Sequence, residues 1–317
     1  MKCGNDMSEN FKGNDILRKC TLCPRECGAD RTKGFGFCRA GENIRAAKAY
    51  LHMWEEPCIS GTRGSGTVFF SGCGLKCVYC QNYRISAENF GREISTESLS
   101  EVFLRLQEQG AHNINLVTAC QYVPHILSAL EICGDRLKIP VAYNSSGYEK
   151  VSTLEMLRGR VKIFMPDMKY LSSELSAKYS GAADYFEAAK AAVGRMIEIA
   201  GKPVFDDEGI LQGGVIIRHM VLPGGYRDSV ALINWIAENF PKESFLLSLM
   251  SQYTPYKNLP SEFKELNRRV STFEYEKVAN AVRELGFEGY MQERSSAKEE
   301  YTPEFDLGGI DELIINN

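Results

Sequence analysis

Three cysteines, Cys73, Cys77 and Cys80, lie close together in the stretch FFSGCGLKCVYCQN, directly after an apolar run. Iron–sulfur clusters are held by cysteine thiolates. A [4Fe–4S] cube has four irons, so three local thiolates leave one iron without a protein ligand. An open coordination position is typical of a catalytic metal site. The alternative is three free thiols or part of a zinc site, although zinc sites usually pair CxxC with a second CxxC or a histidine pair.

A second cysteine group precedes this loop. Its spacing matches neither a ferredoxin cluster nor a common zinc finger closely. Four thiolates are enough for a closed metal site, and zinc, an auxiliary iron–sulfur cluster and no metal all stay open. The group consists of Cys20, Cys23, Cys27 and Cys38.

The composition narrows the class of protein. The chain has 317 residues, 44% of them hydrophobic and 25% charged, as in ordinary globular proteins. A net charge of −4 without a long basic run argues against nucleic acid as a partner. The polar N-terminal stretch and the lack of a long apolar segment argue against secretion and against membrane spanning, so we expect a cytoplasmic protein.

The cysteine and histidine counts narrow the chemistry. Eleven cysteines in a reducing compartment are better explained as metal ligands, redox thiols or buried side chains than as disulfides. We expect Cys58 and Cys120 to be packing thiols; the alternatives are a stray metal ligand for Cys58 and a reactive thiol for Cys120. Cys3 and Cys133 carry no signal. Only four histidines are present, and HExxH, GxSxG and Walker A motifs are absent from the sequence.

Alternation of short apolar runs with amphipathic segments predicts an α/β protein with a mostly parallel sheet. Six strand–helix units are too few for a closed eight-stranded barrel, so we predict a partial barrel over 61–290. A cysteine-rich N-terminal extension (1–60), expected to be irregular, and an acidic C-terminal tail packed on the barrel (291–317) flank it. Ser98 and Glu101 suggest a capping box at the first barrel helix. The predicted strands are 67–71, 114–118, 140–144, 161–165, 214–222 and 245–250, and the predicted helices are 98–110, 123–134, 150–158, 172–200, 228–239 and 274–286.

The CxxxCxxC motif, with the aromatic Tyr79 before its last cysteine, resembles the radical S-adenosylmethionine (SAM) superfamily. Other segments extend the likeness over nearly the whole chain. They resemble an uncharacterised branch named after the pyruvate formate-lyase-activating enzyme. The segments are CTLCPRECGADRTKGFGFCRAG, HMWEEPCISG, GTVFFSGCGLKCVYCQN, AHNINLVT, YNSSGYE, MPDMKY, RHMVLPGG and MSQYTP.

The resemblance implies a partial (β/α)6 radical SAM barrel whose three cysteines hold a [4Fe–4S] cluster. In that superfamily SAM chelates the open iron through its amino and carboxylate groups. Reductive cleavage of SAM gives a 5′-deoxyadenosyl radical, which abstracts hydrogen from a substrate. The resemblance also implies an oxidoreductase-type enzyme that works anaerobically with an electron donor such as flavodoxin or ferredoxin.

Polar residues at the predicted strand ends suit this site, because reactive groups of parallel barrels gather there. Asp167 and Lys169 continue the apolar face of the 161–165 strand, and the resemblance implies that Lys169 meets the SAM carboxylate. Each residue also has an ordinary structural explanation as a strand end, a turn or a core side chain. The Gly-Gly-Glu motif of glycyl-radical activases is absent. The expected cofactor-binding residues are Tyr79, Thr118, Asn144, Ser146, Asp167, Lys169 and His219.

Two of these expectations depend on side-chain direction. On the 214–222 strand, alternation places His219 on one face and Arg218 on the other. We expect His219 to point inward toward SAM and Arg218 to pair with helix carboxylates. After the last strand, Gln252, Tyr253 and Thr254 are expected on the substrate side.

The leading hypothesis is therefore a radical SAM enzyme that abstracts hydrogen from an unidentified substrate. The substrate is either a backbone glycine of a partner protein, as for an activase, or a small molecule or peptide. The alternative from another class is a non-catalytic iron–sulfur protein that transfers electrons or senses redox state. Cleavage of SAM to 5′-deoxyadenosine separates the two classes.

Overall fold

The computed structural model of the chain describes residues 13–255, 259–292 and 303–311. Within those ranges, no helix is both long enough and apolar enough to cross a membrane. Cys3 and most of the predicted C-terminal tail lie outside the described residues.

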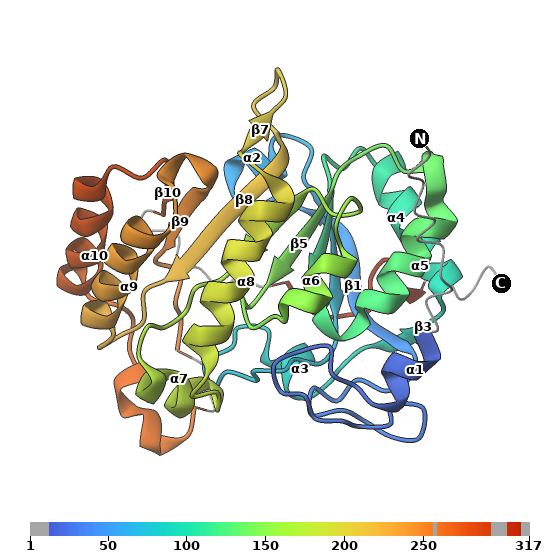
Figure 1. The fold of residues 1–317 in the computed structure, drawn as a ribbon, viewed down its shortest axis with the longest axis horizontal. Helices are drawn as coiled ribbons and strands as arrows, with labels where there is room; N and C mark the ends of the chain where they lie inside the picture. The colour runs from blue at the N-terminus through green and yellow to red at the C-terminus, as the bar shows by residue number, and fades with distance from the viewer. Residues whose placement is uncertain (1–12, 256–258, 293–302, 312–317) are drawn as a thin grey trace, which may run out of the picture.

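One ten-stranded sheet forms the centre of the molecule (Figure 1). Its strands follow the order β10-β9-β8-β6-β5-β4-β2-β1-β3, and β7 pairs with β8 outside this path. Neighbours from β2 to β10 are parallel, whereas β1 pairs antiparallel with β2 and with β3. Among the described strands, the terminal β10 and β3 do not pair, so the fold is a partial barrel, as predicted. The strands are β1 (Ile44–His52), β2 (Ser65–Phe70), β3 (Arg92–Ile94), β4 (Ile114–Val117), β5 (Val141–Ser145), β6 (Ile163–Pro166), β7 (Val204–Phe205), β8 (Leu211–Met220), β9 (Leu246–Met250) and β10 (Gly289–Met291).

All six predicted strands are present, as β2, β4, β5, β6, β8 and β9, and the predicted helices follow them. The expected 172–200 helix is two helices, because α7 ends at Gly181, whose left-handed φ of 59° caps it. The predicted capping box at Ser98 is wrong, since Ser95 is the N-cap and accepts from the Ser98 amide. The helices are α1 (Gly13–Arg18), α2 (Pro57–Ser60), α3 (Tyr83–Ser86), α4 (Thr96–Glu108), α5 (Val123–Cys133), α6 (Val151–Met156), α7 (Ser173–Ser180), α8 (Tyr185–Ala200), α9 (Tyr226–Asn239) and α10 (Thr272–Leu285).

The strand β1 corrects the expectation that 1–60 is irregular. Its nine residues alternate partly between buried and half-buried positions, and it extends the sheet beyond β2. The N-terminal segment therefore contributes to the sheet as well as to the cysteine-rich loop that precedes β1. In Figure 1 this loop, drawn in blue, lies at the lower edge of the molecule beside α3.

Apolar side chains cover both faces of the sheet. The larger cluster lies between the strands and helices α4 to α10 and includes Val215 and Ile217 of β8. A smaller cluster lies on the other face and includes Ile216 of β8 with Ile163 and Met165 of β6. This second face is the inner face of the partial barrel.

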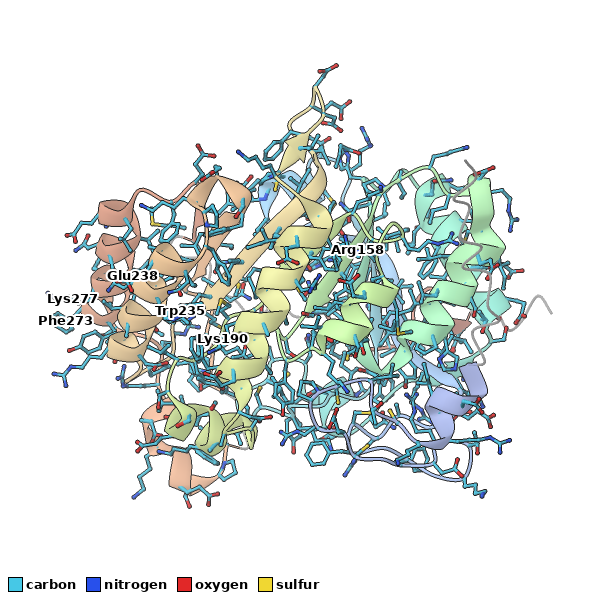
Figure 2. The ribbon with its side chains drawn as sticks, viewed as in Figure 1. Arg158, Lys190, Trp235, Glu238, Phe273 and Lys277 are labelled. Carbon is cyan, nitrogen blue, oxygen red and sulfur yellow. The ribbon has the colours of Figure 1, made fainter. Side chains whose placement is uncertain are left out.

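The outer surfaces of the helices carry polar side chains, as amphipathic helices packed on a sheet require. Figure 2 shows Lys190, Glu238 and Lys277 on the outer side of α8, α9 and α10. Aromatic contacts also join neighbouring helices. The ring of Phe186 on α8 lies edge to face with that of Trp235 on α9, with centroids 4.9 Å apart. The helical layer thus fixes the strand ends from outside.

Candidate active site

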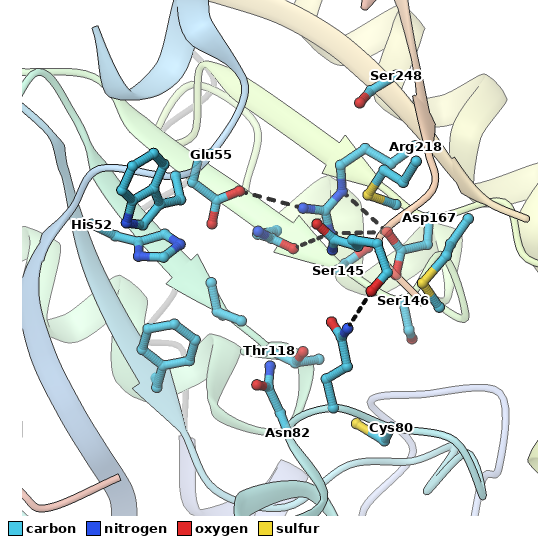
Figure 3. Close-up of a pocket in the computed structure, with 18 of the residues that line it drawn as sticks. His52, Glu55, Cys80, Asn82, Thr118, Ser145, Ser146, Asp167, Arg218 and Ser248 are labelled. Atoms are coloured by element: carbon cyan, nitrogen blue, oxygen red, sulfur yellow. Dashed lines mark hydrogen bonds and ion pairs between the residues drawn. The ribbon is translucent and has the colours of Figure 1, made fainter. Parts of the chain in front are cut away.

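A cavity of about 490 Å³ lies over the inner face of the partial barrel (Figure 3). Residues from the loop after β2 and from the ends of β4, β5, β6 and β8 line it. The sequence-predicted residues that it brings together are Cys73, Cys77, Tyr79, Cys80, Thr118, Asn144, Ser146, Asp167 and Lys169. His219 is not among its lining residues.

The loop with the three cysteines is fixed by short polar contacts. The Leu75 amide donates to Cys73 Sγ at 3.4 Å, and the Ser180 hydroxyl donates to Cys77 Sγ at 3.0 Å. Burial raises the pKa of the Cys77 thiol and raises that of Cys80 to about 12. Without a metal these two groups are therefore neutral thiols at neutral pH, and a bound metal would stabilise their thiolates.

The donor set fits an iron–sulfur cube better than a single ion. Among the described residues, no three His, Cys, Asp or Glu side chains converge as they would around one metal ion. A cube separates its thiolate ligands more widely than one ion does. The three thiols nevertheless share one cavity wall, and besides burial Cys73 contributes to the raised pKa of both Cys77 and Cys80. Three sulfurs that face one cavity without meeting at a point suit a cluster.

Tyr79 anchors the cysteine loop through its buried hydroxyl and ring. Its hydroxyl lies 2.6 Å from the Tyr170 hydroxyl, which in turn lies 2.8 Å from the Ser180 hydroxyl. Tyr79 is 4% exposed and its ring packs edge to face on Tyr170. Tyr79 lines the cavity, and its hydroxyl also connects the cysteine loop, through Tyr170, to Ser180 at the end of α7.

The ion pair at the end of β6 has the predicted orientation. The Lys169 ammonium lies 2.5 Å from Asp167 Oδ2, and both side chains are 17% exposed. Burial alone would lower the pKa of Lys169, but Asp167 and Cys77 outweigh it and raise that pKa. For Asp167, burial is outweighed by Arg218 and Lys169, which lower its pKa. Both groups are charged at neutral pH and lie beside the cysteines.

Arg218 also lines this cavity, and the prediction for β8 is wrong in direction. Arg218 Nη2 lies 2.9 Å from Asp167 Oδ1 and donates to Asn144 Oδ1 at 2.5 Å. His219 instead faces the helical layer, where its Nδ1 lies 2.6 Å from the Met168 carbonyl. Alternation correctly placed Arg218 and His219 on opposite faces of β8. Because β8 is apolar on both faces, the pattern could not tell which face is the inner one.

Polar groups of the neighbouring strand ends complete this side of the cavity. Thr118 follows β4, and Asn144 and Ser146 lie at the end of β5. Gln252 lines the cavity and its carbonyl accepts from Gln81 Nε2 at 3.0 Å, whereas Tyr253 is fully buried in the helical core. Of the three residues expected on the substrate side, Gln252 lines the cavity, whereas Tyr253 and Thr254 are not among its lining residues, and the role of Gln252 stays a prediction.

Sequence reasoning missed the acidic groups on the far side of the cavity. Glu55 Oε2 lies 3.5 Å from Arg218 Nη1, and Glu55 Oε1 accepts from Asn115 Nδ2 at 3.1 Å. Glu56 also lines the cavity and is 9% exposed. The available signal was the pair of adjacent glutamates before Pro57, in a stretch where no strand had been predicted.

The second cysteine group gathers at a neighbouring cavity. Cys20, Cys23, Cys27 and Cys38 all line it, and so does Cys120, for which only a packing role was expected. A Cβ placed on Gly36 would lie 3.5 Å from Cys38 Sγ and 3.6 Å from Cys27 Sγ, so both sulfurs face the same small space. Burial raises the pKa of Cys23 to about 12. As predicted, Cys58 is a buried packing residue.

The two cysteine sites share a wall. Three residues line both cavities: Cys73, Thr118 and Ser146. Gly74, next to Cys73, lines only the second cavity. A Cβ on Gly72, whose φ is +87°, would come within 2.4 Å of the Cys38 carbonyl. Only glycine permits this approach of the N-terminal loop to the cluster loop.

Comparison with known proteins is consistent with this geometry. The model of the Radical SAM superfamily matches residues 67–236. An uncharacterized protein of Methanocaldococcus jannaschii is 30% identical over 274 residues, which cover 83% of this chain and 74% of the relative.

Solved structures give weaker likenesses. Streptococcus suis SuiB bound to S-adenosylmethionine is 15% identical with a TM-score of 0.46, covering 70% of this chain and 48% of SuiB. The chain thus spans about half the length of SuiB. A domain of pyruvate-formate lyase-activating enzyme from Bacteroides vulgatus is 12% identical with a TM-score of 0.41, covering 55% and 92% of the two chains. At these scores neither likeness supports a conclusion about this chain.

Proposed function

The chain belongs to the radical SAM superfamily, and on that premise we propose that it cleaves S-adenosylmethionine reductively and abstracts hydrogen from a substrate. The observation that supports this most is the shared cavity. It brings the three loop cysteines together with the Lys169–Asp167 ion pair at the end of β6. Family membership implies a [4Fe–4S] cluster and SAM, and the residues present suit both.

In our proposal Cys73, Cys77 and Cys80 hold the cluster through their thiolates. When bound, the reduced cluster and SAM together supply a 5′-deoxyadenosyl radical, which is the oxidant for C–H abstraction. The protein's own contribution is to hold, orient and shield these groups. Ser180 and the Leu75 amide donate to the ligand sulfurs, and hydrogen bonds of this kind tune a cluster's reduction potential.

Lys169 is the proposed partner of the SAM carboxylate. It is a charged, largely buried ammonium that lines the cavity next to the cysteines. A cation in this position complements a carboxylate through a charge-assisted hydrogen bond. Asp167 holds the ammonium in place, and Arg218 fixes the other oxygen of Asp167. Thr118, Asn144 and Ser146 are the proposed polar contacts for the rest of SAM.

Two substrate classes are compatible with this site. One is a glycine of a partner protein, which would make the enzyme activase-like, and the other is a small molecule or peptide. In either case the electron comes from a donor such as flavodoxin or ferredoxin. The absence of Gly-Gly-Glu after β4, where the chain has Thr118-Ala119-Cys120, does not favour the activase subtype.

We also propose that the second cysteine group holds a metal, with an auxiliary iron–sulfur cluster as the preferred occupant. Four cysteines with Cys120 as a fifth thiol around one cavity suit a cluster. Its wall is shared with Cys73, so this metal would lie next to the radical site.

The proposal is tested by anaerobic incubation of the reconstituted, reduced protein with SAM. Formation of 5′-deoxyadenosine and methionine supports the enzyme, and replacing Cys73, Cys77 and Cys80 with alanine is expected to abolish it. Cys133→Ala is a matched control, since Cys133 is buried between α4 and α5 and lines neither cavity. A reduced cluster that never cleaves SAM would instead indicate the non-catalytic electron-transfer or redox-sensing protein.

A further inference from the structure

The cavity has a second end that the proposed radical chemistry does not use. Beyond Arg218 it is lined by His52, Glu55 and Glu56, which precede α2, and by Ser248 of β9 and Tyr290 of β10. Figure 3 shows His52 and Glu55 on the opposite side of the cavity from Cys80, with Arg218 on the far side from the cysteine loop. We call this group of five residues the acidic end of the cavity.

In the part of the cavity lining that the structure describes, carboxyl groups outnumber cations. Both of these cations are already engaged, since Lys169 pairs with Asp167 and Arg218 pairs with Asp167 and Glu55. Burial lowers the pKa of His52 to about 4, so its ring is neutral at neutral pH. The described lining therefore has one more carboxyl group than it has cations. The carboxylates are Glu55, Glu56 and Asp167, and the cations are Lys169 and Arg218.

Glu56 is the carboxyl group of this set that the described residues satisfy least. It is 9% exposed, and its Oε2 atom has no hydrogen-bond partner among them. Burial raises the pKa of Glu56, although Arg218 and the Ser248 hydroxyl lower it, so a cation bound at Oε2 would favour the ionised carboxylate. Burial first, then Cys58 and then Glu56, raise the pKa of Tyr290, and both Glu56 and Tyr290 line this end of the cavity.

We propose, resting on the radical SAM function above, that the substrate carries a positively charged amine or guanidinium group that binds Glu56 at the acidic end of the cavity. The cation would stabilise the ionised form of Glu56 and give its Oε2 atom a partner. Glu55, held by Arg218 and Asn115, supplies a second carboxyl group at this end. The wall here includes Trp54 and Tyr290, which can pack against the carbon stem of such a group.

The cationic amino group of SAM itself does not explain the acidic end. In this superfamily that amino group binds the open iron, beside the cysteines. Lys169, Asp167 and Arg218 form the charged chain that continues from the cysteines to Glu55. A cation bound at Glu56 would therefore lie at the other end of the chain of ion pairs from the SAM amino group.

The test uses the cluster-loaded protein under anaerobic conditions, without SAM or reductant. Thermal unfolding is measured with agmatine, butylamine and a short peptide containing lysine and arginine, against butyramide and butyrate. A ligand that binds only the folded state raises the melting temperature. We expect the cationic probes to raise it and the neutral and anionic ones to leave it unchanged. Agmatine and butylamine report on a small-molecule source of the cation, and the peptide reports on a protein source.

Glu56→Gln keeps the shape of the side chain and removes its charge. It is expected to weaken binding of the cationic probes about tenfold to a hundredfold. Glu208→Gln, an exposed partner of Arg63 outside the cavity, is the control and should bind like the wild type. The comparison of cationic with neutral probes in the wild type needs no variant, so it decides the matter even if Glu56→Gln folds poorly.

Equal shifts for cationic and neutral probes, or no shift up to the solubility of every cation, would overturn the assignment. An undiminished cation effect in Glu56→Gln would overturn the role of Glu56. Because SAM is left out, these outcomes are independent of the radical chemistry. Failure to form 5′-deoxyadenosine would refute the proposed function instead, whatever the cations do.

Discussion

The hydroxyl of Ser180, the last residue of α7, donates a hydrogen bond to the sulfur of Cys77 at 3.0 Å. The two residues are 103 positions apart in the sequence. Both are buried, and the same hydroxyl lies 2.8 Å from the Tyr170 hydroxyl. Helix α7 therefore acts directly on a proposed cluster ligand.

Ser180→Ala removes this donor and is expected to make the cluster harder to reduce, because hydrogen bonds to ligand sulfurs stabilise the reduced state. A hydrogen bond of ~1 kcal/mol corresponds to a fall of about 40 mV in a one-electron potential. The measurement is a redox titration followed by electron paramagnetic resonance. Ser176→Ala, on the same helix with its hydroxyl on the Ser173 carbonyl, is the control. An unchanged potential in Ser180→Ala would mean that the bond is absent once the cluster is bound.

Lys169→Ala is expected to weaken SAM binding about tenfold to a hundredfold, since a charge-assisted hydrogen bond contributes about 1.5–3 kcal/mol. Iron content should stay the same, because Lys169 is not a proposed ligand. Titration of the reconstituted protein with SAM measures the change. Lys162→Ala, an exposed residue just before β6, should bind SAM normally. Wild-type affinity in Lys169→Ala would return this residue to a purely structural ion pair.

Substitution of Cys23 and Cys38 with alanine tests the second metal site. Metal binding is coupled to local folding, so the double variant should melt at a lower temperature than the wild type. If the occupant is an iron–sulfur cluster, iron should fall by one cluster's worth while the spectroscopic signal of the cluster at Cys73, Cys77 and Cys80 survives. Zinc loss with unchanged iron would identify zinc. Unchanged metal content and melting would show that no metal binds there.

Glu274 gives a prediction about pH. Its carboxylate accepts from Arg268 at 2.7 Å, from the Gly224 amide and from the Ser271 amide in a capping box that begins α10. Arg268 first, and then the backbone amides, lower the pKa of Glu274 below its ordinary value of 4.5. A lowered pKa stabilises the fold above pH 4.5, and this stability is lost as the pH falls further.

Glu274→Gln should therefore reduce the free energy of unfolding by about 2 kcal/mol at pH 7. The difference from the wild type should shrink as the pH drops below 4.5, where the unfolded chain takes up a proton at Glu274, until the folded protein is protonated there as well at still lower pH. Denaturant unfolding at pH 7 and at a series of pH values below 4.5 measures the difference. Glu276→Gln, an exposed residue of the same helix, is the control and should change little. A deficit that stays constant down to low pH would contradict the electrostatic origin.

The parallel strands were predictable because each is a short apolar run followed by an amphipathic helix, a pattern that extends over several residues. β1 was missed because Ile44–His52 follows a stretch dominated by cysteine, glycine and charge. Without β1, nothing in the sequence placed Glu55 and Glu56 inside the barrel. The contacts between Glu55 and Arg218, and between Arg218 and Asp167, join strands far apart in the sequence. Such contacts depend on the tertiary structure and leave no local pattern in the sequence.

The inward or outward direction of β8 shows a related limit. Asp167 and Lys169 were placed correctly because the apolar face of β6 ends in charge at one side only. On β8, Arg218 and His219 are both polar and both follow apolar residues, so either face was compatible with the pattern. The charges of Asp167 and Glu55 decide the question, since they attract the guanidinium into the cavity.

An open sheet has two free edges, and exposed edges can pair with other chains and cause aggregation. Among the described residues the terminal strands are short: β3 and β10 have three residues each, and β3 carries Arg92 and Glu93. Where β1 continues beyond β3, its edge is hydrogen-bonded to Leu307 and Gly308. Very short and charged edge strands offer few backbone groups to a foreign strand. The partial barrel can therefore stay unclosed while giving little opportunity for edge-to-edge self-association.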